Sequence, residues 1–145
     1  MKTYWDTSAV INAAISAEVM DRLDTGEHVT RLHTFAEFFS TMTGRGVEVA
    51  DQAGTAVRVL FAPNDCAQWL RAFSDKVGLE ELSRDELLDA IDEAQARNVQ
   101  GAKVYDYWHA LVCRKAKADE LLTRNTWHFE ELGRTISAPT KVTWP

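Results

Sequence analysis

The chain has 145 residues, 46% hydrophobic and 26% charged, which predicts one globular domain over residues 1–145 whose core needs no metal or disulfide. Its net charge of −6 argues against a broad nucleic-acid-binding surface, but is compatible with a small acidic site that meets phosphate through divalent cations. Cys66 and Cys113 are far apart, which excludes a cysteine-based zinc site and predicts reduced thiols. With no secretory leader and no membrane-spanning apolar run, we expect a cytoplasmic protein without membrane contact.

In the N-terminal half, apolar strands are predicted to alternate with helices. The expected strands cover residues 3–5 and 28–32. The expected helices cover residues 7–23 (one helix or two), 35–43 after a cap at Thr34, 51–61 and 65–75.

The C-terminal half continues this alternation. The expected strands cover residues 77–82, 120–123 and 141–144. The expected helices begin after the capping box of Ser83 and Glu86 and end near residues 98–101, then cover 103–118 and 126–132. Strands that alternate with helices predict an α/β fold with a mainly parallel sheet covered on both faces.

Asp6 follows the first predicted strand directly and precedes Thr7-Ser8. In open α/β sheets, ligands bind at the carboxyl ends of the strands, so a carboxylate there is a candidate functional residue. The alternative is that Asp6 caps the helix that follows, because Asp is a favoured N-cap residue.

Glu37 and Asp106 are the other two candidate carboxylates. Glu37 lies on the expected helix over 35–43, whose core-facing stripe consists of Phe35, Phe38, Phe39 and Met42. Glu37 falls on the opposite side, so the simple alternative is a solvent-facing first-turn Glu favoured by the helix dipole. Asp106 lies on a helix that is apolar or aromatic on nearly every side, so we expect it to be buried with a charge partner or a metal. The simple alternative is a pair with Lys103 or His109, or a first-turn Asp that serves the helix dipole.

Two polar residues accompany these acids. His109 lies one turn beyond Asp106, and a lone His on a packed helix is more often a satisfied core residue than a ligand. Asn125 follows the strand over 120–123 and is either a turn or cap residue or a neutral oxygen donor beside the carboxylates.

Four segments, in this order, resemble the PIN domain and, within it, the VapC-type toxins of toxin–antitoxin pairs. They are Tyr4-Trp5-Asp6-Thr7-Ser8-Ala9, Thr34-Phe35-Ala36-Glu37-Phe38-Phe39, Tyr105-Asp106-Tyr107-Trp108-His109-Ala110 and Leu122-Thr123-Arg124-Asn125-Thr126-Trp127-His128-Phe129. The resemblance implies a three-layer α/β/α sandwich around a mainly parallel sheet of four to five strands. It also implies endonucleolytic RNA cleavage with Mg²⁺ or Mn²⁺ held by Asp6, Glu37 and Asp106, homodimers and a cognate antitoxin protein. The family's usual fourth acid is missing, and Asn125 and His128 occupy that loop, which puts the second metal position in doubt.

The residue types suit this chemistry. Mg²⁺ prefers carboxylate and water oxygens, so Asp6 and Asp106 would hold it while Glu37 holds a water or acts as a base. The remaining candidates have supporting roles: Thr7 and Ser8 orient a carboxylate or phosphate, Asn125 holds a water or second metal, and Arg45, Lys103 and Arg124 contact the RNA backbone.

Other functions fit part of the pattern. A PIN-like binding module that has lost catalysis would explain the missing acid, and a scaffold domain would need none of these roles. A phosphoryl-transfer protein with Asp6 as nucleophile needs a second Asp where Ser8 stands. The aromatic content exceeds what a small core needs and favours a dimer and a protein partner. The tryptophans concerned are Trp5, Trp69, Trp108, Trp127 and Trp144.

Overall fold

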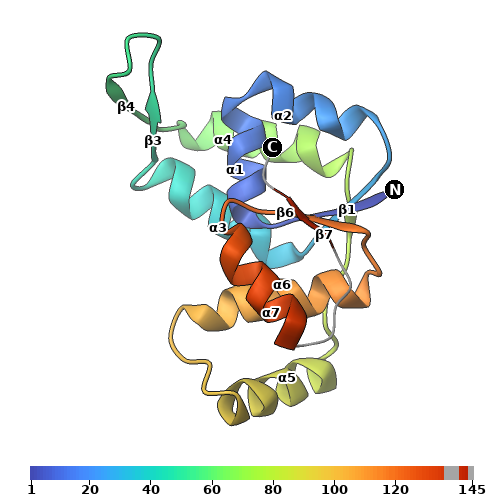
Figure 1. Ribbon diagram of the computed structural model, residues 1–145. Coiled ribbons are helices and arrows are strands. Elements are labelled where there is room, and N and C mark those ends of the chain that lie inside the picture. The colour runs from blue at the N-terminus through green and yellow to red at the C-terminus, as the bar shows by residue number, and fades with distance from the viewer. Residues whose placement is uncertain (136–140, 144–145) are drawn as a thin grey trace.

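The computed structural model describes residues 1–135 and 141–143, which form an α/β fold around a five-stranded parallel sheet (Figure 1). The strand order is β5-β2-β1-β6-β7, and each neighbouring pair is parallel. The strands are β1 (Lys2–Trp5), β2 (Glu27–Thr30), β5 (Gly78–Leu79), β6 (Glu120–Leu122) and β7 (Lys141–Thr143). The predicted fold class is confirmed, with β1 in the centre of the sheet.

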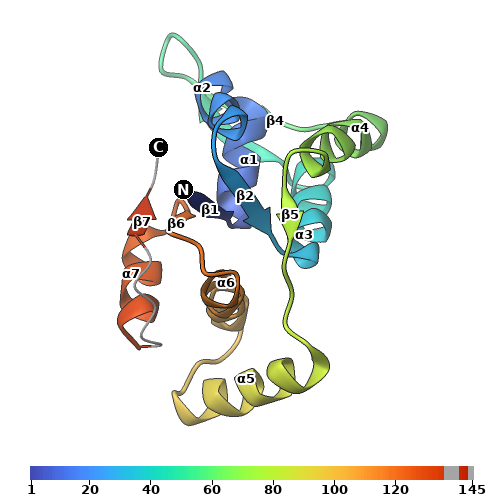
Figure 2. The ribbon, with the colours of Figure 1, turned by 90° about the vertical axis from the view of Figure 1, so that its right-hand side faces the viewer.

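Helices cover both faces of this sheet (Figure 2). The first layer contains α1 (Thr7–Ile15), α2 (Ala17–Asp21), α3 (Leu32–Thr43) and α4 (Pro63–Ser74), with a short 3-10 helix at Arg22–Asp24. The second layer contains α5 (Arg84–Ala96), α6 (Lys103–Lys115) and α7 (Thr126–Thr135). The predicted capping box is present at the start of α5, where Ser83 and Glu86 exchange hydrogen bonds.

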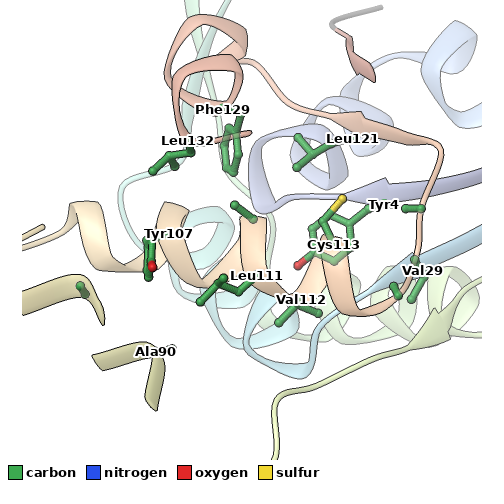
Figure 3. Packing of buried hydrophobic residues seen from close by; sticks show 14 residues of the cluster. Tyr4, Val29, Ala90, Tyr107, Leu111, Val112, Cys113, Leu121, Phe129 and Leu132 are labelled. Atoms are coloured by element: carbon green, nitrogen blue, oxygen red, sulfur yellow. The ribbon is translucent and has the colours of Figure 1, made fainter. Parts of the chain in front are cut away.

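The core is divided into two hydrophobic clusters because successive strand residues point to opposite faces of a sheet. Tyr4 and Leu121 pack with α5, α6 and α7. Their neighbours Trp5 and Leu122 pack with α1 to α4. Figure 3 shows the first cluster, in which Tyr4 of β1 lies next to Cys113 of α6. The α/β/α arrangement follows from these two clusters.

The predicted helix over 51–61 is wrong, because this segment is part of an antiparallel hairpin. Strands β3 (Val47–Ala50) and β4 (Ala56–Val59) form a separate two-stranded sheet that projects from the body (Figure 1). The turn between them decides the structure: the Asp51 side chain accepts hydrogen bonds from the backbone N–H groups of Ala53 and Thr55, and Gly54 has a φ of 79°. This turn chemistry outweighs the helix propensity of the alanines nearby.

Two details of α3 also differ from the prediction. The helix begins at Leu32, so Arg31 occupies the N-cap position and Thr34 lies inside the helix, where its hydroxyl accepts a hydrogen bond from Thr30. Phe39 is exposed, whereas Phe38 and Met42 are buried.

The last strand ends at Thr143, and the part of the predicted strand at residue 144 lies outside the described residues. Among the described residues, no helix is long and apolar enough to cross a membrane.

Candidate active site

A cleft of about 720 Å³ opens at the carboxyl ends of β1 and β6. Segments from the β1–α1 junction, α3, α6 and the loop after β6 contribute to it. It is lined by most of the site residues that the sequence predicts, namely Asp6, Thr7, Ser8, Glu37, Asp106, Arg124 and Asn125. The fold therefore brings together residues that are as far apart as 6 and 125 in the sequence.

Asp6 is held at the bottom of this cleft by three hydrogen bonds to its carboxylate. Its Oδ1 accepts from the Ser8 hydroxyl at 2.7 Å and from the Ala9 backbone N–H at 2.9 Å. Its Oδ2 accepts from the Thr123 hydroxyl at 2.5 Å. Asp6 is therefore the N-cap of α1, as the simple alternative predicted, and also lines the cleft.

Burial makes the Asp6 carboxylate unfavourable in its charged form. The side chain is buried, and this raises its pKa even though His109, Thr123, Ser8 and the Ala9 N–H all favour ionisation. A cation in the cleft would therefore stabilise this carboxylate more than it would stabilise a solvated one.

Glu37 is not the solvent-facing residue of the simple alternative. Its side chain is 29% exposed, and Oε2 accepts a hydrogen bond from the Thr7 hydroxyl at 3.0 Å. Oε1 lies 3.2 Å from His33 Nε2 and 3.6 Å from His109 Nε2, yet it is buried and accepts no well-formed hydrogen bond from the described residues. The reason is that this side of α3 faces α6, where His33 stacks on Tyr105 and Trp108, rather than water.

The pKa of Glu37 nevertheless lies below its usual value. Burial alone would raise it, but the neighbouring imidazole of His109, the Thr7 hydroxyl and the charge of His33 together outweigh burial. Glu37 is thus ionised at neutral pH, with Oε2 oriented by Thr7 and Oε1 buried beside His33 and His109.

His109 is a buried, hydrogen-bonded core residue that also reaches the cleft. It is buried, and its Nδ1 is hydrogen-bonded to the Tyr4 hydroxyl at 2.7 Å, as expected of a satisfied core residue. Its Nε2 points toward the cleft, 3.5 Å from the Thr7 hydroxyl. The aromatic core of β1 is connected in this way to Glu37.

A buried arginine lies behind Glu37. The side chain of Arg31 is completely buried, and its guanidinium carbon is 3.8 Å from the centre of the Trp108 ring. Arg31 Nη2 is 4.0 Å from Glu37 Oε1, and Nε is 4.0 Å from Glu81 Oε1. Burial lowers the Arg31 pKa, opposed by nearby Tyr4 and acidic groups. Nothing in the sequence indicated that Arg31 would lie behind Glu37, because Arg31 was placed at the end of a strand.

Asp106 differs from its prediction in exposure and in partner. The carboxylate is 33% exposed, and its Oδ2 is 2.8 Å from His128 Nδ1 rather than paired with Lys103 or His109. The N-terminal turn of α6 lies at the edge of the core, where Tyr105 is also exposed, so the helix is buried only further along. His128 comes from α7, a contact that helical spacing within α6 could not reveal.

Three arginines, Arg45, Arg58 and Arg124, line the same cleft. Arg45 and Arg124 were predicted from the sequence, whereas Arg58 was missed because its segment was predicted as a helix. Arg58 lies on the hairpin, where it donates to the Arg45 carbonyl and pairs with Glu48 at 2.9 Å. Lys103, the third predicted cation, lines a neighbouring cleft instead.

The cleft contains carboxylates, the type of oxygen donor that Mg²⁺ and Mn²⁺ prefer. Hard cations prefer carboxylate oxygens, and Mg²⁺ is commonly held by one or two carboxylates with water completing its shell. Asp6 and Asp106 would hold the ion, and Glu37 would bind one of its waters. Among residues 1–135 and 141–143, no three His, Cys, Asp or Glu side chains are gathered closely enough to hold a metal ion together.

Comparison with protein-family models and with curated proteins finds no match. Functional inference therefore depends on the fold and on the side chains of the cleft.

Proposed function

We propose that the chain is a Mg²⁺- or Mn²⁺-dependent endoribonuclease that hydrolyses RNA phosphodiesters. One observation carries the proposal: Asp6, Glu37 and Asp106, from three separate elements, line one cleft at the carboxyl edge of a parallel sheet. RNA binding requires positive charge that contacts the phosphates on either side of the scissile bond. The arginines of the same cleft supply this charge.

Each residue then has a role in binding or positioning. When bound, the cation lowers the pKa of a water and offsets charge on the phosphate. Asp6 and Asp106 would hold the cation, and the hydroxyls of Ser8 and Thr123 fix the orientation of Asp6. Glu37, oriented by Thr7, accepts a proton from the attacking water.

The loop after β6 has a smaller share in this mechanism. Asn125 lies just before α7, where its carbonyl accepts from Phe129 N–H and its own N–H donates to the Thr123 hydroxyl at 3.0 Å. Its amide would hold a water or a weak second cation at the cleft. The Ser8 hydroxyl accepts from the Arg124 backbone N–H at 2.8 Å, so this loop and the Asp6 turn are held together.

We also propose that the chain is the toxin of a type II toxin–antitoxin pair, that it forms homodimers and that a small antitoxin protein inhibits it. The resemblance of four sequence segments to the VapC-type toxins supports this proposal. The aromatic argument is weaker than expected, because Trp5 and Trp69 pack in the core and Trp108 stacks on Arg31. Growth arrest on expression, relieved by the product of an adjacent short reading frame, tests the pairing. A monomer in sedimentation at micromolar concentration would contradict the dimer.

A second candidate is a catalytically weakened binding module of the same fold. It is favoured by Asn125, an amide at the position where the resemblance implies an acid. Such a module would bind Mn²⁺ and RNA and leave the RNA intact, so the experiment on cleavage decides between the two candidates.

The test is cleavage of an end-labelled RNA with single-stranded and looped regions. The chain stripped with EDTA should be inactive and should recover on addition of Mg²⁺ or Mn²⁺. Glu37→Gln should lose most activity because the amide cannot accept the proton. Asp89→Asn removes the same charge from the exposed surface of α5 and serves as the control. Activity that survives EDTA in the purified chain would overturn the proposal.

A further inference from the structure

A second cleft of about 630 Å³ adjoins the candidate active site. It lies between the end of α5, the first turns of α6 and the start of α7. Asp106 and Asn125 line both clefts, so the two are neighbours across these residues. Its volume is within the range of about 300 to 1,000 Å³ that is typical of ligand sites. A linear polymer such as RNA, bound at Asp106, would therefore continue directly into this second cleft.

The most unusual residue of this cleft is Trp127. It is the second residue of α7 and is 70% exposed, whereas Trp5 is fully buried. Leaving an indole ring in water forgoes the favourable free energy of burying a large apolar surface. A ligand that covers the ring would recover that free energy.

The other walls of the cleft are already ordered. His128 is fixed by its 2.8 Å contact with Asp106, and the Tyr107 hydroxyl donates to Glu93 at 3.0 Å. Lys103 and Arg97 add positive charge to the same lining, and Glu131 adds an acid. The cleft thus combines one exposed aromatic face with cations and lies beside a carboxylate of the proposed catalytic site.

We propose that this cleft binds one unstacked nucleobase of single-stranded RNA, stacked on Trp127, beside the phosphodiester that is cut. The proposal rests on the proposed function and adds the form of RNA that the site accepts. Bases in single strands stack on exposed aromatic side chains with little dependence on sequence. Lys103 and Arg97 line the same cleft and would contact the flanking phosphate. A continuous duplex cannot enter, because its bases are already stacked on one another.

A protein partner is the competing occupant, since interfaces are also enriched in tryptophan. The observations favour RNA because the cleft shares Asp106 and Asn125 with the proposed catalytic site and carries cations beside the aromatic ring.

The test measures binding of a fluorescent single-stranded RNA in the presence of Mn²⁺, in a Glu37→Gln background that keeps Asp6 and Asp106 but blocks cleavage. Trp127→Ala should weaken binding about ten-fold, the usual effect of losing one stacking platform. Trp127→Phe should keep most of the affinity while losing much of the tryptophan quenching that RNA causes. Leu88→Ala, at an exposed apolar residue of α5, is the control and should bind normally.

Abasic nucleotides locate the stacked base. After the cut site of the wild-type chain is mapped, one abasic position beside it should weaken binding to the same extent as Trp127→Ala, and the two changes together should cost no more than either alone. If the Trp127→Ala variant binds and cleaves RNA as well as the wild-type chain does, the inference is overturned. That result would leave the endoribonuclease proposal intact and would point to a protein partner. A wild-type chain that neither binds nor cleaves RNA would overturn both.

Discussion

The hydroxyl of Thr123 donates a 2.5 Å hydrogen bond to Asp6 Oδ2, although the two residues are 117 positions apart in the sequence. Trp5 and Leu122 are paired in the register of β1 and β6, so the residues that follow them meet at the sheet edge. Asp6 also donates its backbone N–H to the Leu122 carbonyl. The sheet itself therefore fixes the orientation of the central carboxylate.

Thr123→Val should lower Mn²⁺ affinity about ten-fold with little change in the fold. Valine has nearly the shape of threonine but cannot donate to Asp6, and losing a hydrogen bond behind a metal ligand typically costs 10- to 100-fold in affinity. Thr123→Ser keeps the hydroxyl and is the matched control. Calorimetric titration with Mn²⁺ measures the difference, and equal affinities for the valine and serine variants would contradict the role of this bond.

Asp6→Asn should make the metal-free chain more stable at neutral pH. Because the pKa of Asp6 is raised in the folded chain, stability falls as pH rises from the unfolded-state value through the folded-state pKa. Asparagine carries no charge and escapes this loss, so its advantage should shrink as the pH falls below the folded-state pKa. Mn²⁺ should reverse the order by stabilising the wild-type chain. Thermal unfolding over a pH series, with and without Mn²⁺, measures this. A variant that is less stable at neutral pH would show that the buried charge is well compensated.

Much of this architecture was predictable, and the failures have identifiable physical causes. Asp6 and Asn125 follow strands, so their place at the carboxyl edge could be predicted from the alternation of strands and helices. The contact between Asp106 and His128 joins two helices and has no signature in the spacing of either. The hairpin was missed because its alanines favour a helix, while the turn at Asp51 decides the outcome through side-chain hydrogen bonds. The place of Arg58 in the cleft was missed for the same reason, because Arg58 lies on this hairpin.

Asn125→Asp should raise Mn²⁺ affinity, because a carboxylate binds a hard cation much better than an amide does. Asn125 lines the same cleft as Asp6 and Asp106, so the added charge would act at the metal. Asn125→Ala should reduce cleavage much less than Asp6→Asn does. Titration of the wild-type chain and the Asn125→Asp variant measures the change. An unchanged affinity would mean that Asn125 is a turn residue outside the reach of the metal.

Gly46→Ala should weaken RNA binding by displacing the hairpin that carries Arg58. Gly46 has a φ of 68°, and a Cβ there would collide with the Val59 carbonyl oxygen of the facing strand. Gly54→Ala is a matched control, since its φ of 79° imposes a similar strain of about 1 to 2 kcal/mol, but a Cβ meets nothing within 4 Å. Fluorescence anisotropy with labelled RNA compares the two. Equal affinities would show that the hairpin takes no part in binding.

The central claim is that Asp6 and Asp106 act together on one RNA phosphodiester with the help of a divalent cation. The most direct measurement is the single-turnover rate of RNA cleavage in saturating Mn²⁺ for the wild-type chain, Asp6→Asn and Asp106→Asn, with circular dichroism to establish that each is folded. We expect each variant to lose about a hundred-fold or more in rate, the scale of losing one preorganised group at a developing charge. Cleavage at the wild-type rate by both folded variants would contradict the claim.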